Sequence, residues 1–189
     1  MKLKICGMKD AANIVDVANL LPGYMGFIFY PQSPRYVGAD FQMPEIPISI
    51  KKVGVFVNEG QETILEIVDK YKLDCVQLHG TESFEYCKVL SETFSKILNE
   101  NPGCQNVHVQ LIKAFGVDEN IGFSILERYK GQKSFFLSGG IDLQNAAGIK
   151  DSPLKRQKIH AIDVNSKFET ATGMKDIHKL QLLKDELSG

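Results

Sequence analysis

Several short apolar runs in this chain end in residues that could do chemistry. Cys6 closes such a run and is followed by Gly7, so a thiol stands beside backbone that can turn sharply. A thiol acts as a base or nucleophile when nearby positive charge favours its thiolate. The alternative interpretation is a buried structural cysteine, since cysteine is common in protein cores.

Two further positions are suited to binding anions. Arg35 follows Pro34, which restricts the backbone, and its planar guanidinium matches a carboxylate. The alternative for Arg35 is a solvated loop arginine. Gly139 and Gly140 follow an apolar run, and paired glycines let backbone N–H groups approach a phosphate, helped by the N-terminus of a following helix. Most such pairs, however, are only turns.

Polar residues also end two other runs. Gln77 and His79 come at the end of one, where they either line a cavity or make structural hydrogen bonds. Asp163 ends another and is followed by Asn165 and Ser166. Its carboxylate either binds a substrate hydroxyl or, by default, makes structural hydrogen bonds.

Composition excludes several classes of protein. The 189 residues predict one domain over 1–189, and 22 basic against 23 acidic residues argue against a nucleic-acid partner. No basic run marks a membrane surface, and no apolar run approaches the about 20 residues that span a bilayer. The four cysteines form no C-x-x-C pair and have no metal-ligand spacing, so we expect free thiols, no metal and a cytoplasmic protein.

Strands and helices alternate along the chain, which predicts parallel βαβ units. The expected strands are Leu3–Met8, Met25–Tyr30, Lys52–Asn58, Cys75–Gly80, Val107–Phe115, Ser134–Gly140 and Ile159–Ser166. The expected helices are Asp10–Leu21, Glu62–Tyr71, Ser83–Leu90, Phe123–Tyr129, Leu143–Ile149 and Asp176–Leu187. Either an open doubly wound sheet or a barrel fits. Polar or glycine tips at almost every strand favour the barrel, whose sites are built from many strand ends.

Seven short motifs in register resemble the phosphoribosylanthranilate isomerase family. They are Lys4–Met8, Gly26–Phe29, Ser33–Val37, Val53–Asn58, Val76–Gly80, Leu137–Gly140 and Asp163–Ser166. The resemblance implies a TIM-type (β/α)8 barrel in tryptophan biosynthesis. It also implies an Amadori rearrangement of N-(5-phosphoribosyl)anthranilate, an aminoaldose, to an aminoketose. No cofactor or metal takes part, and the only partner implied is this small phosphosugar.

The resemblance also assigns roles. Cys6 is implied as the base that removes the sugar C2′ proton, and Arg35 as the group that binds the anthranilate carboxylate. Gln77 and His79 are expected to contact substrate. The phosphate is expected at the tips of the last two strands, on the residues Gly139, Gly140, Asn165 and Ser166.

One departure from the family is visible in the sequence. Seven strands are found rather than eight, and the sixth-strand unit that carries the family's general acid, an Asp, has no counterpart between Phe115 and Phe123. Asp163 is the nearest remaining candidate for the acid. The alternatives are an impaired barrel that only binds phosphosugar or serves as a scaffold, and a phosphosugar-binding barrel with other chemistry. The strands that flank the gap are expected to expose unpaired edges, so we expect either an imperfect barrel or closure by a partner. The chain is expected to be a monomer or homodimer.

Overall fold

The computed structural model of the chain describes residues 1–100, 110–116, 135–151 and 159–188. The expected helix at Phe123–Tyr129 lies outside these ranges. The barrel strands are β1 (Lys2–Cys6), β2 (Tyr24–Ile28), β3 (Lys51–Phe56), β4 (Cys75–Leu78), β5 (Gln110–Gly116), β6 (Phe135–Ser138) and β7 (Ile159–Val164). The helices are α1 (Ala11–Asn19), α2 (Gln61–Tyr71), α3 (Phe84–Glu100), α5 (Leu143–Asp151) and α6 (Ile177–Ser188). A 3-10 turn, η3 (Ser166–Phe168), and a hairpin of β8 (Glu169–Ala171) and β9 (Met174–Lys175) join β7 to α6.

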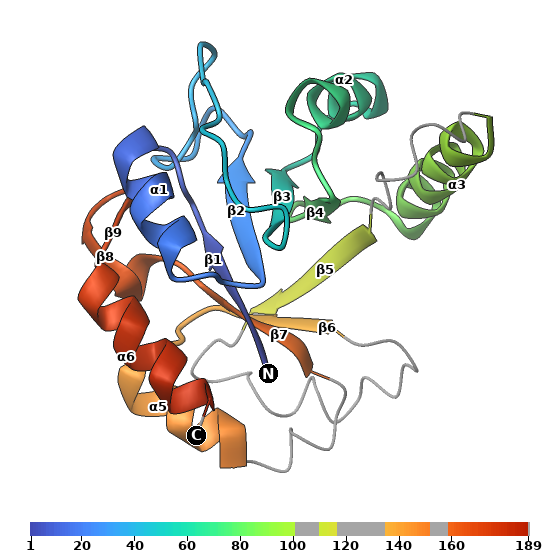
Figure 1. Cartoon of the computed structure of the whole chain (residues 1–189). Coiled ribbons are helices and arrows are strands. Elements are labelled where there is room, and N and C mark those ends of the chain that lie inside the picture. The colour runs from blue at the N-terminus through green and yellow to red at the C-terminus, as the bar shows by residue number, and fades with distance from the viewer. Residues whose placement is uncertain (101–109, 117–134, 152–158, 189) are drawn as a thin grey trace.

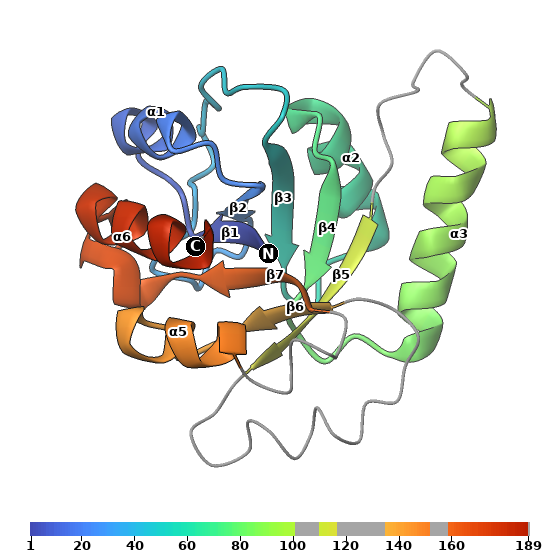
Figure 2. The same cartoon turned by 60° about the horizontal axis from the view of Figure 1, so that its bottom comes forward.

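The seven described barrel strands form a closed parallel barrel. Each strand pairs in parallel with the next along the chain, and β7 pairs with β1. The helices lie outside this ring, with α1, α5 and α6 on one side and α2 and α3 on the other (Figures 1 and 2). The α/β barrel with seven recognisable strands is therefore confirmed, and the open doubly wound sheet is excluded.

The expectation of unpaired edges beside the missing unit is wrong. β5 and β6 pair directly with each other, Phe115 lying opposite Leu137. The next pair around the ring, β6 and β7, shifts register between Phe135 and Phe136. Strand number, tilt and stagger are linked in a barrel, and an irregularity of this kind lets fewer strands complete the circle.

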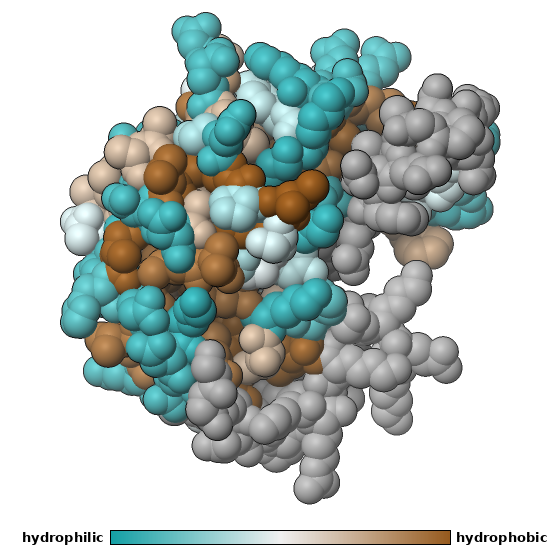
Figure 3. All heavy atoms as spheres, viewed as in Figure 1, coloured by the Kyte–Doolittle hydropathy of each residue, from teal (hydrophilic) through white to brown (hydrophobic). Residues whose placement is uncertain are grey.

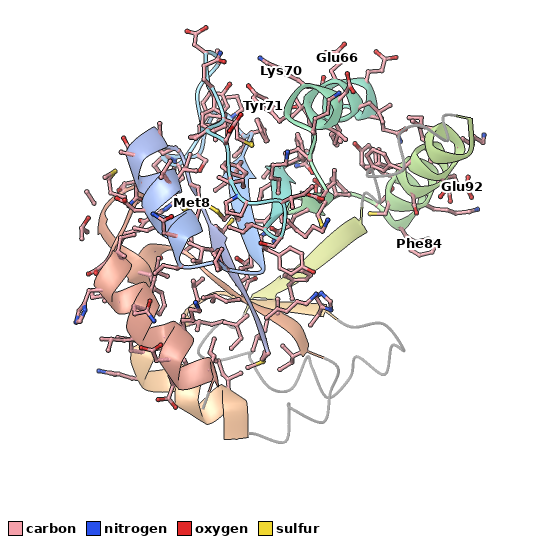
Figure 4. All side chains as sticks on the ribbon, in the orientation of Figure 1. Met8, Glu66, Lys70, Tyr71, Phe84 and Glu92 are labelled. Carbon is pink, nitrogen blue, oxygen red and sulfur yellow. The ribbon has the colours of Figure 1, made fainter. Side chains whose placement is uncertain are left out.

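Helices pack against the outer face of the barrel. In α1, the Asp10 carboxylate caps the helix by accepting from the Asn13 N–H at 2.9 Å. Ile14 and Val17 on the same helix are fully buried. Met8, also fully buried, fills the space beside α1 (Figure 4). Figure 3 shows hydrophobic residues between α1 and α6, with hydrophilic residues along the outer edges of that face.

The inner face of the barrel has two layers. Strand alternation places every second residue inside. The lower layer is apolar and takes one residue from each of five strands, namely Tyr24, Val53, Cys75, Phe136 and Ala161. The layer above it is polar, and its buried residues are Lys4, Gln77, Ser138 and Asp163. A polar layer at the carboxyl ends of parallel strands is where this architecture builds sites.

Candidate functional site

A cavity of about 270 Å³ opens at the carboxyl ends of the strands. Its walls include eight residues that the sequence singled out, which are Cys6, Gln77, His79, Gly139, Gly140, Asp163, Asn165 and Ser166. Ile28, Val55 and Ile141 add an apolar wall. Residues far apart in the sequence thus meet in one cavity, as expected for strand ends on one rim. Arg35 is not among the described lining residues.

Cys6 faces the cavity from the end of β1 and is 6% exposed. Gly26 on β2 leaves room for the thiol, because a Cβ there would lie 2.7 Å from the Cys6 sulfur. Burial raises the pKa of Cys6 above its ordinary value, and the charge of Lys4 acts in the opposite direction without cancelling it. The positive charge expected near the thiol is therefore present, but burial has the larger effect.

Lys4 and Asp163 form an ion pair inside the barrel below the thiol. The Lys4 ammonium donates to Asp163 Oδ2 at 2.8 Å, and the two side chains are 0% and 6% exposed. Burial by itself would lower the pKa of Lys4, but the negative charges of Asp163 and Cys6 outweigh it and raise that pKa. The pair therefore places a charged ammonium and a carboxylate in the polar layer.

Two buried oxygens in this layer have no hydrogen-bond partner among the described residues. They are Asp163 Oδ1 and Gln77 Oε1. Both residues line the cavity, and Gln77 Nε2 contacts Asp163 Oδ2 at 3.5 Å. Leaving a buried acceptor unpaired costs about 1–3 kcal/mol, so the arrangement suits a ligand that brings hydroxyl donors.

The glycine pair adopts the backbone that its sequence suggested. Gly139 and Gly140 have φ values of 91° and 61°, in the left-handed region that glycine adopts without strain. The helix that follows offers less than expected. Asp142 Oδ1 accepts from the backbone N–H groups of Gln144 and Asn145, both at 2.9 Å, so its own carboxylate caps the N-terminus of α5. The first turn of α5 therefore has fewer unpaired N–H groups for an anion than an uncapped helix would have.

Arg35 is not a solvated loop residue. Its side chain is 19% exposed, and Nε and Nη2 donate to the two carboxylate oxygens of Glu169 at 2.9 and 2.7 Å. The guanidinium stem runs beside Asn165, because a Cβ on Gly7 would lie 2.7 Å from both Arg35 Cδ and Asn165 Oδ1. Arg35 therefore lies close to Asn165, a residue that lines the cavity.

Three residues at the site were not anticipated in these positions. Lys4 could have been found from its spacing, since it is two residues before Cys6 and thus on the same face of β1. Lys167 lines the cavity just after Ser166, and nothing in its sequence context separates it from a surface lysine. Glu169, a lower-ranked candidate for the acid than Asp163, proves to be the partner of Arg35. Asp118, another low-ranking acid, lies outside the described residues.

The described ranges contain neither a metal-binding cluster of side chains nor a membrane-spanning helix. Within them, no cluster of three or more His, Cys, Asp or Glu side chains has metal-binding geometry. None of the helices described there combines the length and apolar character that crossing a bilayer requires.

Comparison with known proteins identifies relatives over nearly the whole chain. The family described as N-(5′-phosphoribosyl)anthranilate isomerase matches residues 3–186. An N-(5′-phosphoribosyl)anthranilate isomerase of Parabacteroides distasonis is 36% identical, covering 96% of this chain and 90% of that relative. That alignment spans 202 positions, more than the 189 residues of this chain, so the relative contains residues without a counterpart here.

Solved structures agree with the fold. A phosphoribosyl anthranilate isomerase in complex with reduced 1-(o-carboxyphenylamino)-1-deoxyribulose 5-phosphate is 25% identical, with a TM-score of 0.74 over 100% of this chain and 99% of that one. A structure of monomers generated from the dimeric enzyme of Thermotoga maritima is 24% identical, with a TM-score of 0.71 over the same shares of the two chains.

Proposed function

Because this chain belongs to the N-(5′-phosphoribosyl)anthranilate isomerase family, we propose that the cavity at the strand ends is where it carries out this family's reaction. The enzyme is an isomerase of tryptophan biosynthesis. It converts N-(5′-phosphoribosyl)anthranilate into 1-(2-carboxyphenylamino)-1-deoxyribulose 5-phosphate. The observation that supports this cavity most strongly is the meeting of Cys6, the glycine pair and two unpartnered buried acceptors in one hollow.

We assign the base to Cys6. As the furanose opens, the C1′–O4′ bond breaks, O4′ gains a proton and the nitrogen lone pair forms an iminium with C1′. The Cys6 thiolate then removes the C2′ proton, and the electrons of that bond form an enolamine. Protonation at C1′ and loss of the 2′-hydroxyl proton give the ketone. General acid–base groups contribute about 10²–10⁴-fold to such steps.

We assign the sugar hydroxyls to Asp163 and Gln77, whose buried acceptor oxygens line the cavity. His79 also lines the cavity, and we propose that it contacts the substrate. The phosphate is proposed to lie on the backbone of Gly139 and Gly140 and on Asn165 and Ser166, with Lys167 supplying positive charge.

Asp163 is the proposed proton donor to the ring oxygen. In the structure Asp163 accepts a hydrogen bond from the Lys4 ammonium. To act as acid, Asp163 must carry a proton when substrate binds, and it passes that proton to O4′. Solvent returns a proton to Asp163 after turnover, while Lys4 stays an ammonium throughout.

The setting of the reaction is also proposed. The partner is the small phosphosugar substrate, without nucleic acid or membrane, and the chain acts as a monomer or homodimer in the cytoplasm. The cysteines described in the structure, Cys6, Cys75 and Cys87, are free thiols, which suits a reducing compartment.

A single set of assays tests these assignments. Purified protein is supplied with substrate, and turnover is followed by the fluorescence of the carboxyphenylamino group. Cys6→Ala and Asp163→Asn are each expected to lower kcat by about 100-fold or more. Cys87→Ser, which changes a half-buried thiol on α3, is the matched control and should retain wild-type turnover.

Binding separates the alternative, an impaired barrel. Affinity for the reduced product analogue is measured by calorimetry alongside turnover. Binding of the analogue by wild-type protein without any turnover would favour a phosphosugar-binding scaffold. Undiminished turnover in Cys6→Ala would remove Cys6 from the base role.

A further inference from the structure

Glu169 holds Arg35 through one particular edge of the guanidinium. The contacts run from Nε to Oε1 at 2.9 Å and from Nη2 to Oε2 at 2.7 Å. This side-on pairing uses the Nε–Nη2 edge, and Nη1 has no hydrogen-bond partner among the described residues. A planar guanidinium can bind a second carboxylate through its other edge, Nη1–Nη2. The arginine is thus oriented and still able to bind an anion.

A buried lysine fixes Glu169 in turn. Lys175 Nζ, on a fully buried side chain, donates to Glu169 Oε1 at 2.6 Å and to Asn165 Oδ1 at 2.8 Å. The Gly173 N–H also donates to Glu169 Oε1, at 3.2 Å. Burial acts to raise the pKa of Glu169, but the hydrogen bonds from Arg35 and Lys175 outweigh it and lower that pKa. Glu169 is therefore an ionised acceptor and not a proton donor.

The hairpin that carries these two residues is anchored to the barrel's first helix. Asn13 in α1 is 4% exposed, accepts from the Lys175 backbone N–H at 2.7 Å and donates to the Lys175 carbonyl at 3.0 Å. Figure 1 shows β8 and β9 beside α1, between β7 and α6. The hairpin is thereby a fixed support behind Arg35.

The charges of this cluster do not cancel. Arg35 and protonated Lys175 each carry a positive charge, and Glu169 supplies a single carboxylate between them, while burial lowers the pKa of Lys175. With Lys175 protonated, one unit of positive charge is left over beside Asn165, which lines the cavity. Electrostatic complementarity at such a place favours an anionic group on the ligand.

We infer that Glu169 is a positioning residue that turns the free edge of Arg35 toward the substrate carboxylate, and that Lys175 and the β8–β9 hairpin hold it there. The inference rests on the proposed function, to which we add the role that the family resemblance implies for Arg35, binding of the substrate carboxylate. Glu169 does not itself contact the reacting atoms. It makes the enzyme selective for a carboxyphenyl over a plain phenyl substituent.

The test compares two ligands across matched variants. One ligand is reduced 1-(o-carboxyphenylamino)-1-deoxyribulose 5-phosphate, and the other is the same molecule without the carboxylate. Their dissociation constants are measured by calorimetry for wild type, Arg35→Gln, Glu169→Gln, the double variant and Glu66→Gln. Glu66 is exposed on α2 (Figure 4), so its substitution removes one negative charge away from the cavity.

Glu169→Gln should raise the dissociation constant of the carboxylate ligand by about 10- to 100-fold, as expected for loss of a charged hydrogen bond. The dissociation constant of the other ligand should not change. The double variant should bind no more weakly than Arg35→Gln, because Glu169 acts through Arg35. Glu66→Gln should match wild type for both ligands. The inference would be overturned if Glu169→Gln weakened the binding of both ligands equally. It would also be overturned if this variant bound the carboxylate ligand more tightly, because Glu169 would then compete with that ligand for Arg35.

Failure of the proposed function gives a different result. If Arg35→Gln does not distinguish the two ligands, Arg35 does not bind the carboxylate and both proposals fall. If Arg35→Gln distinguishes them and Glu169→Gln does not, only the positioning role of Glu169 falls. Should Glu169→Gln not fold, Glu169→Asp keeps the charge at a shorter reach. Its smaller loss must again be confined to the carboxylate ligand, and a loss shared by both ligands would overturn the inference.

Discussion

Cys6 and Lys4 lie two residues apart on the inner face of β1, and their surroundings act on the thiol in opposite directions. Burial disfavours the thiolate, while the ammonium of Lys4 favours it. Asp163 partly offsets that ammonium by pairing with it at 2.8 Å. The Cys6 thiol therefore keeps its proton to a higher pH than an exposed thiol does, and its reactivity depends on the neighbouring charges.

Alkylation should report this balance. In a Cys87→Ser background, the rate of Cys6 alkylation by iodoacetamide should rise with pH and reach its midpoint above that of a short unstructured cysteine peptide. Lys4→Met should move the midpoint further up, because loss of a positive charge disfavours the thiolate. Mass spectrometry of the Cys6 peptide gives the rate, and a midpoint below that of the peptide would contradict the effect of burial.

The ion pair beneath the thiol should matter for stability only when it is broken on one side. Lys4→Met leaves Asp163 buried without its cation and should lower the free energy of unfolding by about 3–5 kcal/mol. Replacing both, in Lys4→Met/Asp163→Leu, should restore most of that loss. Urea unfolding measures each value.

An exposed ion pair on α2 supplies the comparison. Lys72 and Asp69 are 69% and 84% exposed, so Lys72→Met should change the unfolding free energy by less than about 1 kcal/mol. If the buried double variant is no more stable than Lys4→Met alone, the assignment of the loss to an unpaired charge is wrong.

At the scale of elements, neighbouring strands define the space that the site residues occupy. Gly26 on β2 lies opposite Cys6 on β1 in the parallel register. A Cβ at Gly26 would lie 2.7 Å from the thiol sulfur and 3.2 Å from Lys4 Cε. Both distances are shorter than ordinary van der Waals contact between such atoms. The glycine therefore belongs to the site although it contributes no side chain.

Gly26→Ala should displace the thiol and the lysine together. The expected result is a loss of about 1–3 kcal/mol in the free energy of unfolding from overpacking, with a marked fall in kcat. Gly148 on α5 is the matched control, since nothing lies within 4 Å of its Cβ position. Gly148→Ala should stabilise by about 0.5–1 kcal/mol, because alanine is the better helix former. Unchanged activity in Gly26→Ala would show that Cys6 and Lys4 can shift to make room for the methyl group without loss of function.

At the scale of the whole molecule, the seven described strands form a closed barrel because β5 and β6 pair directly with each other. Their pairing runs from Ala114 opposite Phe136 to Gly116 opposite Ser138. Backbone groups that would form an open edge are instead paired within the ring. The chain therefore needs no partner strand at this position.

Hydrogen exchange checks this closure. Amides of 114–116 and 136–138 should exchange as slowly as those of β1 and β2 in a monomer isolated by size exclusion. The reason is that ladder hydrogen bonds on both sides protect them. Fast exchange confined to these two segments would indicate an open barrel.

The sequence determined much of this protein by itself. Strand-length apolar runs, each ending in a polar or glycine tip, predicted the parallel barrel, and parallel strands finish on one rim, so the meeting of Cys6 with Gly140 followed. The N-terminal cap that Asp10 provides to α1 is also encoded locally, since it depends on a few adjacent residues.

Only the tertiary structure decided how the strands close and which groups pair. Arg35 and Glu169 are 134 residues apart and Lys4 and Asp163 are 159 apart, and no periodicity encodes such partners. The ring of seven depends on register and tilt, which are properties of all the strands together. The carboxylate of Asp142 likewise caps the N-terminus of α5, a contact that the glycine pair in the sequence does not reveal.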